Sequence, residues 1–256
     1  MSTSSEKFFS NIFSLCERTH KEGFQGAKRE VQKMLKLALF DLAGTTLLDE
    51  GLMEDAFLRV FHAENMPVHV EEILPFRGSA KRPIAETMVS RYRPEGGEEL
   101  ISSIMHGFEQ GLEEGLRASG QSIPGTEKTF EWLRRRGIKV GITTGFSRKI
   151  KDVVMEVLGW DERLIDVTAC SDEVTESRPA PWMIFEAMQR ADVYPASAVM
   201  TVGDTPRDLQ SGTNAGCGFV VGVLSGSGTV ETLGRERHTH LLASVAEIPA
   251  MLGCCL

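Results

Sequence analysis

Short apolar runs that alternate with amphipathic stretches organise most of this chain. Residues 35–40 (LKLALF) form an apolar run that ends directly before Asp41, the pattern of a buried strand that delivers a carboxylate to a loop. Four further runs predict strands, at 139–143, 167–170, 199–202 and 219–223. Between and after them the pattern predicts helices at 129–136, 149–158, 182–191, 209–215 and 245–252. This alternation indicates an α/β fold, a doubly wound parallel sheet with helices on both faces.

Two segments fall outside this alternation. Residues 52–120 keep the apolar spacing of helices, without strand alternation, and they interrupt the α/β pattern directly after its first strand. We therefore expect a core domain at 35–51 and 122–256, with a helical cap domain inserted at 52–121. Residues 1–34 are expected to form a helical extension, because residues 8–15 place apolar side chains along one side of a helix. Packing against the core or a partner subunit is its expected role.

The composition excludes several classes of function. Of the 256 residues, 41% are hydrophobic and 25% are charged, which is ordinary for a globular protein. The formal net charge of -8 argues against a nucleic-acid binder, which needs a basic face. No apolar run approaches the ~18 residues of a membrane span, and the N-terminus lacks the pattern of a secretory signal. Five cysteines without disulfide or zinc-ligand spacing favour a reducing cytoplasm.

Four polar groupings follow predicted strands or open the helices after them. They are Asp41-Leu42-Ala43-Gly44-Thr45-Thr46, Thr143-Thr144-Gly145, Arg178-Pro179-Ala180-Pro181 and Gly203-Asp204-Thr205-Pro206-Arg207-Asp208. A parallel sheet binds its ligand beyond the carboxyl ends of its strands. The positions of all four groupings therefore predict one shared site at that edge.

The residue types at this edge suit phosphoryl chemistry. The Asp41 carboxylate could attack phosphorus, and Arg178 is a fixed cation that offsets the repulsion between two anions. Asp41 and Asp204 offer the hard oxygen ligands that Mg²⁺ prefers, and Asp208 would lie on the same face of a helical turn. Groups expected to contact phosphate oxygens are the hydroxyls and amides of Thr143 and Thr144 and, through close backbone approach, Gly44 and Gly145.

The four groupings, in this order across residues 36–252, resemble the motifs of the haloacid dehalogenase superfamily. The first grouping is similar to that of its phosphonatase branch, whose best-known activity is hydrolysis of phosphonoacetaldehyde. Segments 143–146 (TTGF) and 177–183 (SRPAPWM) support this placement, since the branch resembles this chain in carrying Arg where most of the superfamily carries Lys.

The resemblance implies a Rossmann-like core with an inserted helical cap and an aspartyl-phosphate intermediate on Asp41. It also implies Mg²⁺ held by Asp41, the Ala43 carbonyl and Asp204, with Asp208 close by. The residues that it places around the phosphoryl group or substrate are Ala43, Gly44, Thr45, Thr143, Thr144, Gly145 and Arg178. The branch dimerises through its cap, so a homodimer is expected.

Ala43 separates this chain from ordinary phosphatases of the superfamily. Those enzymes resemble one another in placing a second Asp two residues after the nucleophile, to protonate the leaving alkoxide. Phosphonatases instead use a cap lysine that forms a Schiff base with the substrate aldehyde and so accepts the electrons of the breaking C–P bond. Lys81 lies at the matching position in the segment 76–81 (FRGSAK). A neutral amine is needed there, so its pKa would have to be lowered by burial or by a neighbouring cation, which Arg77 and Arg82 could supply.

The substrate-facing positions depart from the phosphonatase pattern. Members of the branch resemble one another in four residues that this chain lacks. Ile84 replaces their His, Arg77 their Met, Phe146 their Tyr, and Leu52 a residue that is commonly Cys. Two alternatives therefore stay open: a hydrolase of another small phosphorylated metabolite without an imine, and a phosphate-metabolite binding protein without turnover. Dehalogenation is disfavoured, because a carboxylate pair that binds metal serves little purpose with a neutral haloalkane.

Overall fold

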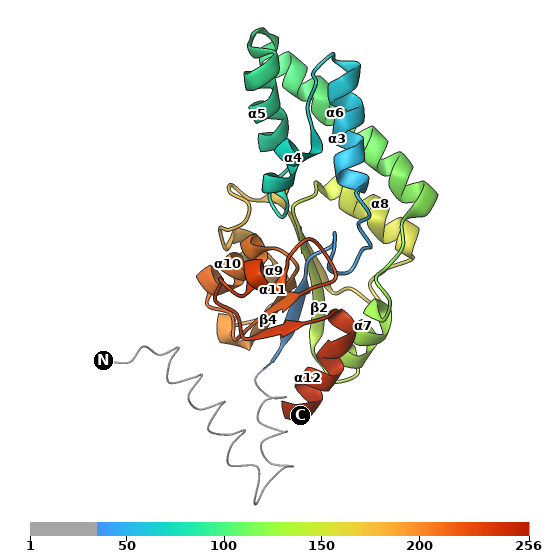
Figure 1. Cartoon of the computed structure of the whole chain (residues 1–256). Helices are drawn as coiled ribbons and strands as arrows, with labels where there is room; N and C mark the ends of the chain where they lie inside the picture. The colour runs from blue at the N-terminus through green and yellow to red at the C-terminus, as the bar shows by residue number, and fades with distance from the viewer. Residues whose placement is uncertain (1–34, 256) are drawn as a thin grey trace, which may run out of the picture.

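The computed structural model describes residues 35–255, and a central parallel sheet organises them (Figure 1). The six strands are β1 (Leu37–Phe40), β2 (Lys139–Thr144), β3 (Val167–Cys170), β4 (Val199–Gly203), β5 (Phe219–Val223) and β6 (His240–Leu242). They lie in the order β3-β2-β1-β4-β5-β6, and all neighbouring pairs are parallel. The predicted α/β, doubly wound class is confirmed. The helical extension predicted at 1–34 lies outside the described residues.

The strand order places the segment that begins with Asp41 at the point in the sheet where the order of the strands reverses. Leu37 of β1 pairs with Lys139 of β2 on one side and with Val199 of β4 on the other. The chain runs from β1 through β2 to β3 on one side and then crosses to β4, β5 and β6 on the other, and such a reversal of strand order opens a crevice beyond the carboxyl ends of the central strands. Asp41 and Asp204 directly follow β1 and β4, so both side chains start at this crevice.

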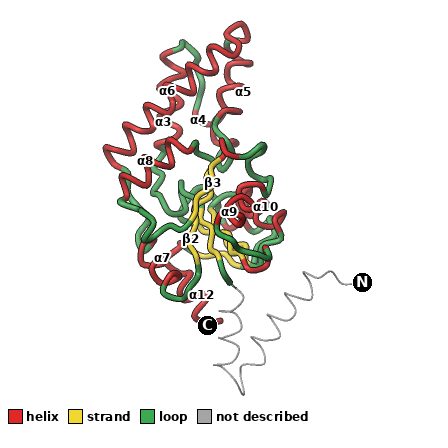
Figure 2. Tube along the Cα trace, turned by 180° about the vertical axis from the view of Figure 1, so that it is seen from behind, coloured by secondary structure: helices red, strands yellow, loops and turns green. Residues whose placement is uncertain are grey.

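Helices cover both faces of the sheet (Figure 2). Helices α7 (Thr126–Arg134), α8 (Arg148–Leu158) and α12 (Ile248–Cys255) share one buried cluster with Phe40, and α9 (Trp182–Arg190) and α10 (Pro206–Ala215) share another with Leu39. Neighbouring strand residues point to opposite faces, and β1 is buried along its whole length. This explains why β1 reads as a continuous apolar run rather than an alternating one.

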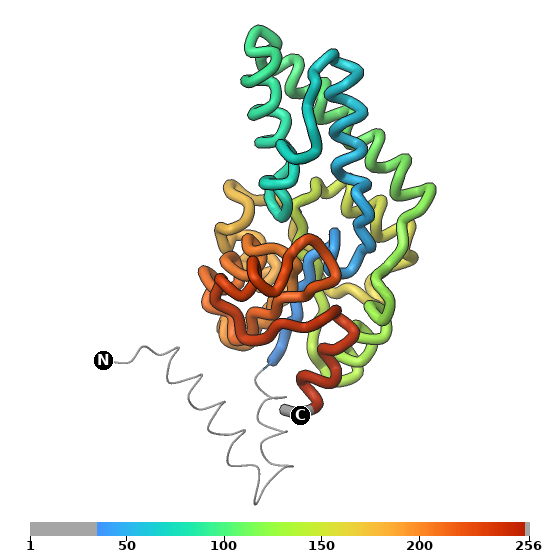
Figure 3. The backbone as a smooth tube through the Cα atoms, viewed as in Figure 1, coloured from blue at the N-terminus to red at the C-terminus, as the bar shows by residue number. Residues whose placement is uncertain are grey.

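Between β1 and β2 the chain builds a separate group of helices beyond the carboxyl edge of the sheet (Figure 3). These are α3 (Leu52–Ala63), α4 (Val70–Ile73), α5 (Arg82–Tyr92) and α6 (Gly97–Ser119). Stacking of Phe57 on Phe108, with ring centroids 3.8 Å apart, joins α3 to α6. We call residues 52–121 the cap; the limits of the core and cap domains stay predictions.

Several elements differ in detail from the sequence prediction. Helix α7 begins at Thr126, and α10 begins at Pro206 because the Thr205 hydroxyl caps its first turn, accepting from the Asp208 amide. Strand β6 and the short helix α11 (Val230–Leu233) were not predicted. Short 3-10 turns occur at Leu74–Phe76, Pro94–Gly96, Ser171–Glu173, Ala196–Ala198 and Val245–Glu247. Within residues 35–255 no helix has both the length and the apolar character that crossing a membrane requires.

Candidate active site

Three buried carboxylates meet at the crevice beyond β1 and β4. Asp41, Asp204 and Asp208 each place one oxygen within 4.8 Å of the others. The side chains are at most 7% exposed for Asp41 and 6% for Asp208, so little water screens their charges. Burial and then repulsion from the other carboxylates raise the pKa of Asp204. Burial also raises the pKa of Asp208, against the lowering effect of Arg178.

Arg178 is the cation that faces this cluster. Its Nη1 donates to Asp41 Oδ1 at 2.7 Å and lies 2.8 Å from Asp208 Oδ1, while Nη2 donates to the Thr143 carbonyl at 2.6 Å and to the Thr143 hydroxyl at 3.1 Å. The guanidinium is buried, and its pKa stays above the ordinary value because of the neighbouring carboxylates. A fixed fork of this kind holds the Asp41 carboxylate in one orientation.

Asp204 is held by a loop that the sequence motifs do not include. The Ser227 amide donates to Asp204 Oδ2 at 2.7 Å and its hydroxyl at 3.0 Å, while the Thr45 hydroxyl donates to Oδ1 at 3.2 Å. Glycine backbone surrounds this carboxylate: a Cβ at Gly226 would lie 2.1 Å from Oδ2, and one at Gly44 would lie 2.8 Å away. Gly44 also has a φ of 77°, which favours glycine.

The charge balance of the cluster fits a divalent cation. Three carboxylates face one guanidinium, and burial together with mutual repulsion raises the pKa values of Asp204 and Asp208. Hard, buried oxygen donors at this separation are the ligands that Mg²⁺ takes. Ala43 lines the adjoining cavity, so its carbonyl belongs to the same neighbourhood. The cluster therefore suits the predicted magnesium site.

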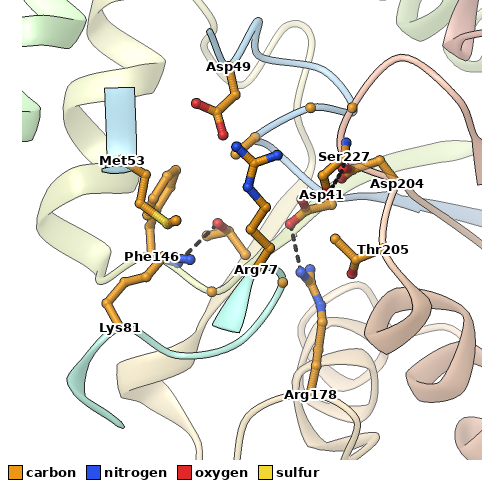
Figure 4. Close-up of a pocket in the computed structure, with 16 residues that line it drawn as sticks. Asp41, Asp49, Met53, Arg77, Lys81, Phe146, Arg178, Asp204, Thr205 and Ser227 are labelled. Carbon is orange, nitrogen blue, oxygen red and sulfur yellow. Dashed lines mark hydrogen bonds and ion pairs between the residues drawn. The ribbon is translucent and has the colours of Figure 1, made fainter. Parts of the chain in front are cut away.

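Figure 4 shows the cavity that joins this cluster to the cap. Asp41, Ala43, Gly44, Thr144, Gly145, Arg178 and Asp204 line it from the core, and Arg77, Gly78 and Lys81 line it from the cap. Its volume is about 40 Å³, room for a few water molecules. Thr45 and Thr143 are predicted phosphate ligands, but the structure turns their hydroxyls to Asp204 and Arg178, and they are not in the cavity wall. Both fix the orientation of residues that do line it.

Lys81, the residue directly before α5, lines the same cavity. Its side chain is buried, and Nζ donates to the Ser79 carbonyl at 3.1 Å and lies 5.2 Å from the centre of the Phe146 ring. The pKa of Lys81 is lowered, chiefly by burial, although Asp41 and Asp49 act in the opposite direction. Burial was one of the two expected causes; the contributing cation is Arg178, whereas Arg77 and Arg82 were the expected ones.

The positions of those two arginines explain this difference. The Arg82 side chain is about half exposed and pairs with Glu86 and Glu98. Arg77 donates from Nε to Glu54 Oε1 at 2.5 Å, so a buried carboxylate accompanies its charge. The pairing neutralises much of the field that Arg77 would exert on a nearby amine.

Several residues of the cavity wall were missed by sequence reasoning. Asp49, Met53, Gly226 and Ser227 line the cavity but stand outside the four motifs. Asp49 comes three residues before α3, and burial followed by repulsion from Glu54 raises its pKa. A carboxylate within a short polar loop was the available signal for Asp49. Gly226 and Ser227 reach the site through the loop after β5, which gives no local signal.

A carboxylate cluster at the switch point of a Rossmann-like sheet, beneath a helical cap, defines a class of hydrolases that act on phosphorus or carbon centres. The chain belongs to the haloacid dehalogenase-like hydrolase family, whose model matches residues 38–222. Within that family it lies in the phosphonatase-like branch, and it is a hydrolase.

Named relatives support this placement. The chain is 32% identical over 218 residues to a phosphonoacetaldehyde hydrolase of Bacteroides fragilis, covering 80% of this chain and 82% of the relative. It is 31% identical over 212 residues to a phosphonoacetaldehyde hydrolase of Bacillus cereus, covering 75% and 77%.

Solved structures share the fold. A phosphonoacetaldehyde hydrolase-like protein from Oleispira antarctica superposes with a TM-score of 0.77 at 21% identity, covering 87% of this chain and 92% of that one. A predicted phosphoglycolate phosphatase from Haemophilus somnus gives a TM-score of 0.74 at 18% identity, covering 85% and 98%. At these identities the likeness concerns the fold alone.

Proposed function

We propose that this hydrolase cleaves the C–P bond of phosphonoacetaldehyde or a related carbonyl phosphonate. The observation that carries the proposal is that Lys81 of the cap and Asp41 of the core line one small cavity. An amine and a carboxylate in one cavity can engage the two ends of a short substrate, the carbonyl carbon and the phosphorus. The relatives named phosphonoacetaldehyde hydrolase support this substrate class.

Asp41 is the proposed nucleophile toward phosphorus. Arg178 binds one of its carboxylate oxygens, Oδ1, and no residue within 35–255 donates a hydrogen bond to the other. Attack by Oδ2 would form an aspartyl-phosphate, which water then hydrolyses. Mg²⁺ held by Asp41, the Ala43 carbonyl and Asp204, with Asp208 close by, would neutralise charge on the phosphoryl oxygens. Arg178 would also contact the phosphoryl group, with backbone approach at Gly44, Thr144 and Gly145.

Lys81 is the proposed electron sink. Its lowered pKa favours the free amine, which attacks the carbonyl carbon and loses water to form an imine that is then protonated. As Asp41 attacks phosphorus, the electron pair of the breaking C–P bond forms a C=C bond, the π pair of the C=N bond moves onto nitrogen, and an enamine remains on Lys81. Protonation and hydrolysis of the enamine release the aldehyde and regenerate the amine. No acid beside the nucleophile is needed, which fits Ala43.

Phosphate release from phosphonoacetaldehyde tests the proposal, with and without Mg²⁺, in the wild type, Lys81→Arg and the control Lys128→Arg. Lys128 is exposed and stands outside the cavity wall. We expect Mg²⁺-dependent release in the wild type and the control, and a loss of at least about a hundredfold in Lys81→Arg, which keeps the charge but forms no imine. Equal rates in all three proteins would refute the imine.

Asp49 favours a second candidate, hydrolysis of a small phosphate ester without an imine. It places a carboxyl group with a raised pKa in the cavity wall, where it could protonate a leaving alkoxide in place of the acid that Ala43 lacks. Esters with a poor alkoxide leaving group would then lose activity in Asp49→Asn, whereas p-nitrophenyl phosphate would be little affected. Retained ester activity in Lys81→Arg would complete this case.

A further inference from the structure

A second cavity adjoins the catalytic cavity across Arg77. It has a volume of about 520 Å³ and shares Arg77, Thr205 and Ser227 with the catalytic wall. The residues that line it include two arginines, Arg77 and Arg207, and no aspartate or glutamate. We call it the outer cavity. In a chain of net charge -8, a wall that contains only positive charges is a local reversal of sign.

Arg77 presents its guanidinium to both cavities. Glu54, whose side chain is only 4% exposed, receives the hydrogen bond of Arg77 Nε. The two terminal nitrogens of Arg77 form no hydrogen bond with residues 35–255, so they keep their donors for a ligand. Figure 4 shows the guanidinium projecting into the catalytic cavity toward Asp49. The hydrogen bond from Nε to a buried carboxylate fixes the orientation of the guanidinium and leaves its two terminal nitrogens available to a ligand.

Arg207 provides the second charge from the core. It follows Pro206 in the first turn of α10, after the Thr205 cap, and its side chain is half-buried. Neither a hydrogen bond nor an ion pair joins it to any residue in the described range 35–255. Arg77 belongs to the cap and Arg207 to the core, so an anion held by both would span the seam between them.

We propose that the outer cavity binds a second anionic group of the substrate, a carboxylate or a phosphate, at the end away from the reacting phosphorus. The proposal rests on the proposed function in that Asp41 and its metal site hold the phosphorus. Phosphonoacetaldehyde carries one anionic group, so it would leave Arg77 and Arg207 unused. The preferred substrate class is therefore a carbonyl phosphonate with a second anion, and the guanidinium forks suit either anion.

Binding of ligands that cannot react tests this inference without relying on turnover. Calorimetric titrations in Mg²⁺ would compare methylphosphonate, which has one anionic group, with 3-phosphonopropionate and propane-1,3-bisphosphonate, which add a carboxylate or a phosphonate. The variants are Arg77→Met, Arg207→Met and the control Arg59→Met. Arg59 belongs to the same cap but is exposed and outside both cavities.

In the wild type and in Arg59→Met we expect a ligand with two anionic groups to bind roughly tenfold or more tightly than methylphosphonate, since charge-assisted hydrogen bonds add to its affinity. This preference should fall toward one in Arg77→Met or Arg207→Met, while methylphosphonate affinity, which reports an intact core site, stays within about twofold in Arg207→Met, because Arg207 does not line the catalytic cavity. Tighter binding of one of the two larger ligands identifies the second anion as carboxylate or phosphate.

A preference that is absent in the wild type, or unchanged in both arginine variants, would overturn the inference. Absence of binding by all three ligands would overturn it as well. Failure of the proposed function has a different signature, because it appears as missing phosphate release or as indifference to Lys81→Arg. The binding preference would remain measurable in that case.

Discussion

Arg178 Nη1 donates to Asp41 Oδ1 at 2.7 Å, across 137 residues of sequence, and leaves Oδ2 of the same carboxylate without a protein donor among residues 35–255. The arginine comes from the segment that opens α9, and the aspartate comes from the end of β1. One oxygen is thus fixed, and the other is the one that we propose to attack phosphorus, since Asp41 lines the catalytic cavity. This relationship gives the first prediction.

Asp41→Asn should lower turnover by at least about a thousandfold, because an amide is not a nucleophile toward phosphorus. The fold should persist, since Asn matches Asp in shape and relieves part of the negative charge in the cluster. Phosphate release and thermal unfolding measure the two effects. Asp192→Asn is the matched control, because Asp192 is exposed with a φ of 52°, which Asn tolerates. A variant at position 41 as active as this control would exclude covalent catalysis there.

Sequence reasoning located the core of this site because strand ends are local features. Asp41 and Asp204 follow runs that read as strands, and parallel pairing alone brings such strand ends together. Arg178 was found for the same reason, through a motif that opens a helix. Strand β6 was missed because His240–Leu242 is a three-residue edge strand of half-buried residues, too short for a periodic signal.

The remaining site residues depend on tertiary packing, which no local pattern encodes. Ser227 binds Asp204 from a loop 23 residues later in the sequence. The Thr143 hydroxyl accepts a hydrogen bond from Arg178 and does not line the cavity. Burial, one of the two causes expected to lower the pKa of Lys81, does so, but the contributing cation, Arg178, was not anticipated because it comes from a distant part of the sequence.

Mg²⁺ should stabilise the protein through the three carboxylates. At a hundredfold excess over Kd, binding to the folded state adds about 2.7 kcal/mol, which raises Tm by roughly 5–10 °C in a domain of this size. Differential scanning calorimetry with Mg²⁺ and with chelator measures the shift. We expect Asp204→Asn to remove most of it and Asp192→Asn to retain it. A full shift in Asp204→Asn would place the ion elsewhere.

The same shift should grow with pH. Asp204 and Asp208 have pKa values raised above the ordinary 3.8, so the metal-free folded protein binds more protons than the unfolded chain above that pH. Its stability therefore falls as pH rises through the raised pKa values. Metal binding displaces those protons, and the Mg²⁺-induced increase in Tm should be larger at pH 8 than at pH 5. A shift that shrinks over this interval would contradict the charge balance described here.

Borohydride trapping should mark Lys81 with a pH dependence set by its lowered pKa. The free amine is the reactive form, so the rate of trapping with phosphonoacetaldehyde should rise with pH and reach half its maximum below the ordinary lysine pKa of 10.5. Mass spectrometry of peptides locates the adduct. Lys128→Arg should be trapped like the wild type, and Lys81→Arg should give no adduct. Trapping that continues to rise beyond pH 10.5 would indicate an amine that is not desolvated.

Gly78→Ala should displace the cap loop that carries Lys81 while the carboxylate cluster of the core stays intact. Gly78 has a φ of 77°, and a Cβ there would lie 2.3 Å from the hydroxyl oxygen of Thr205, the residue that caps α10. The cap loop must retreat to make room, and Lys81 follows three residues later on the same loop. Borohydride trapping at Lys81 and C–P cleavage should both fall at least about tenfold, since a displacement of about 1 Å can cost far more.

Gly137→Ala distinguishes this clash from backbone strain alone. Gly137 has a similar φ of 73°, but nothing lies within 4 Å of an added Cβ. Both alanines lose about 1 kcal/mol or more to the left-handed conformation, so both proteins should unfold at somewhat lower temperature. Trapping at Lys81 should fall in Gly78→Ala alone, and both variants should keep the stabilisation by Mg²⁺, because Asp41, Asp204 and Asp208 belong to the core. Equal trapping in the two variants would mean that contact between Gly78 and Thr205 does not position the lysine.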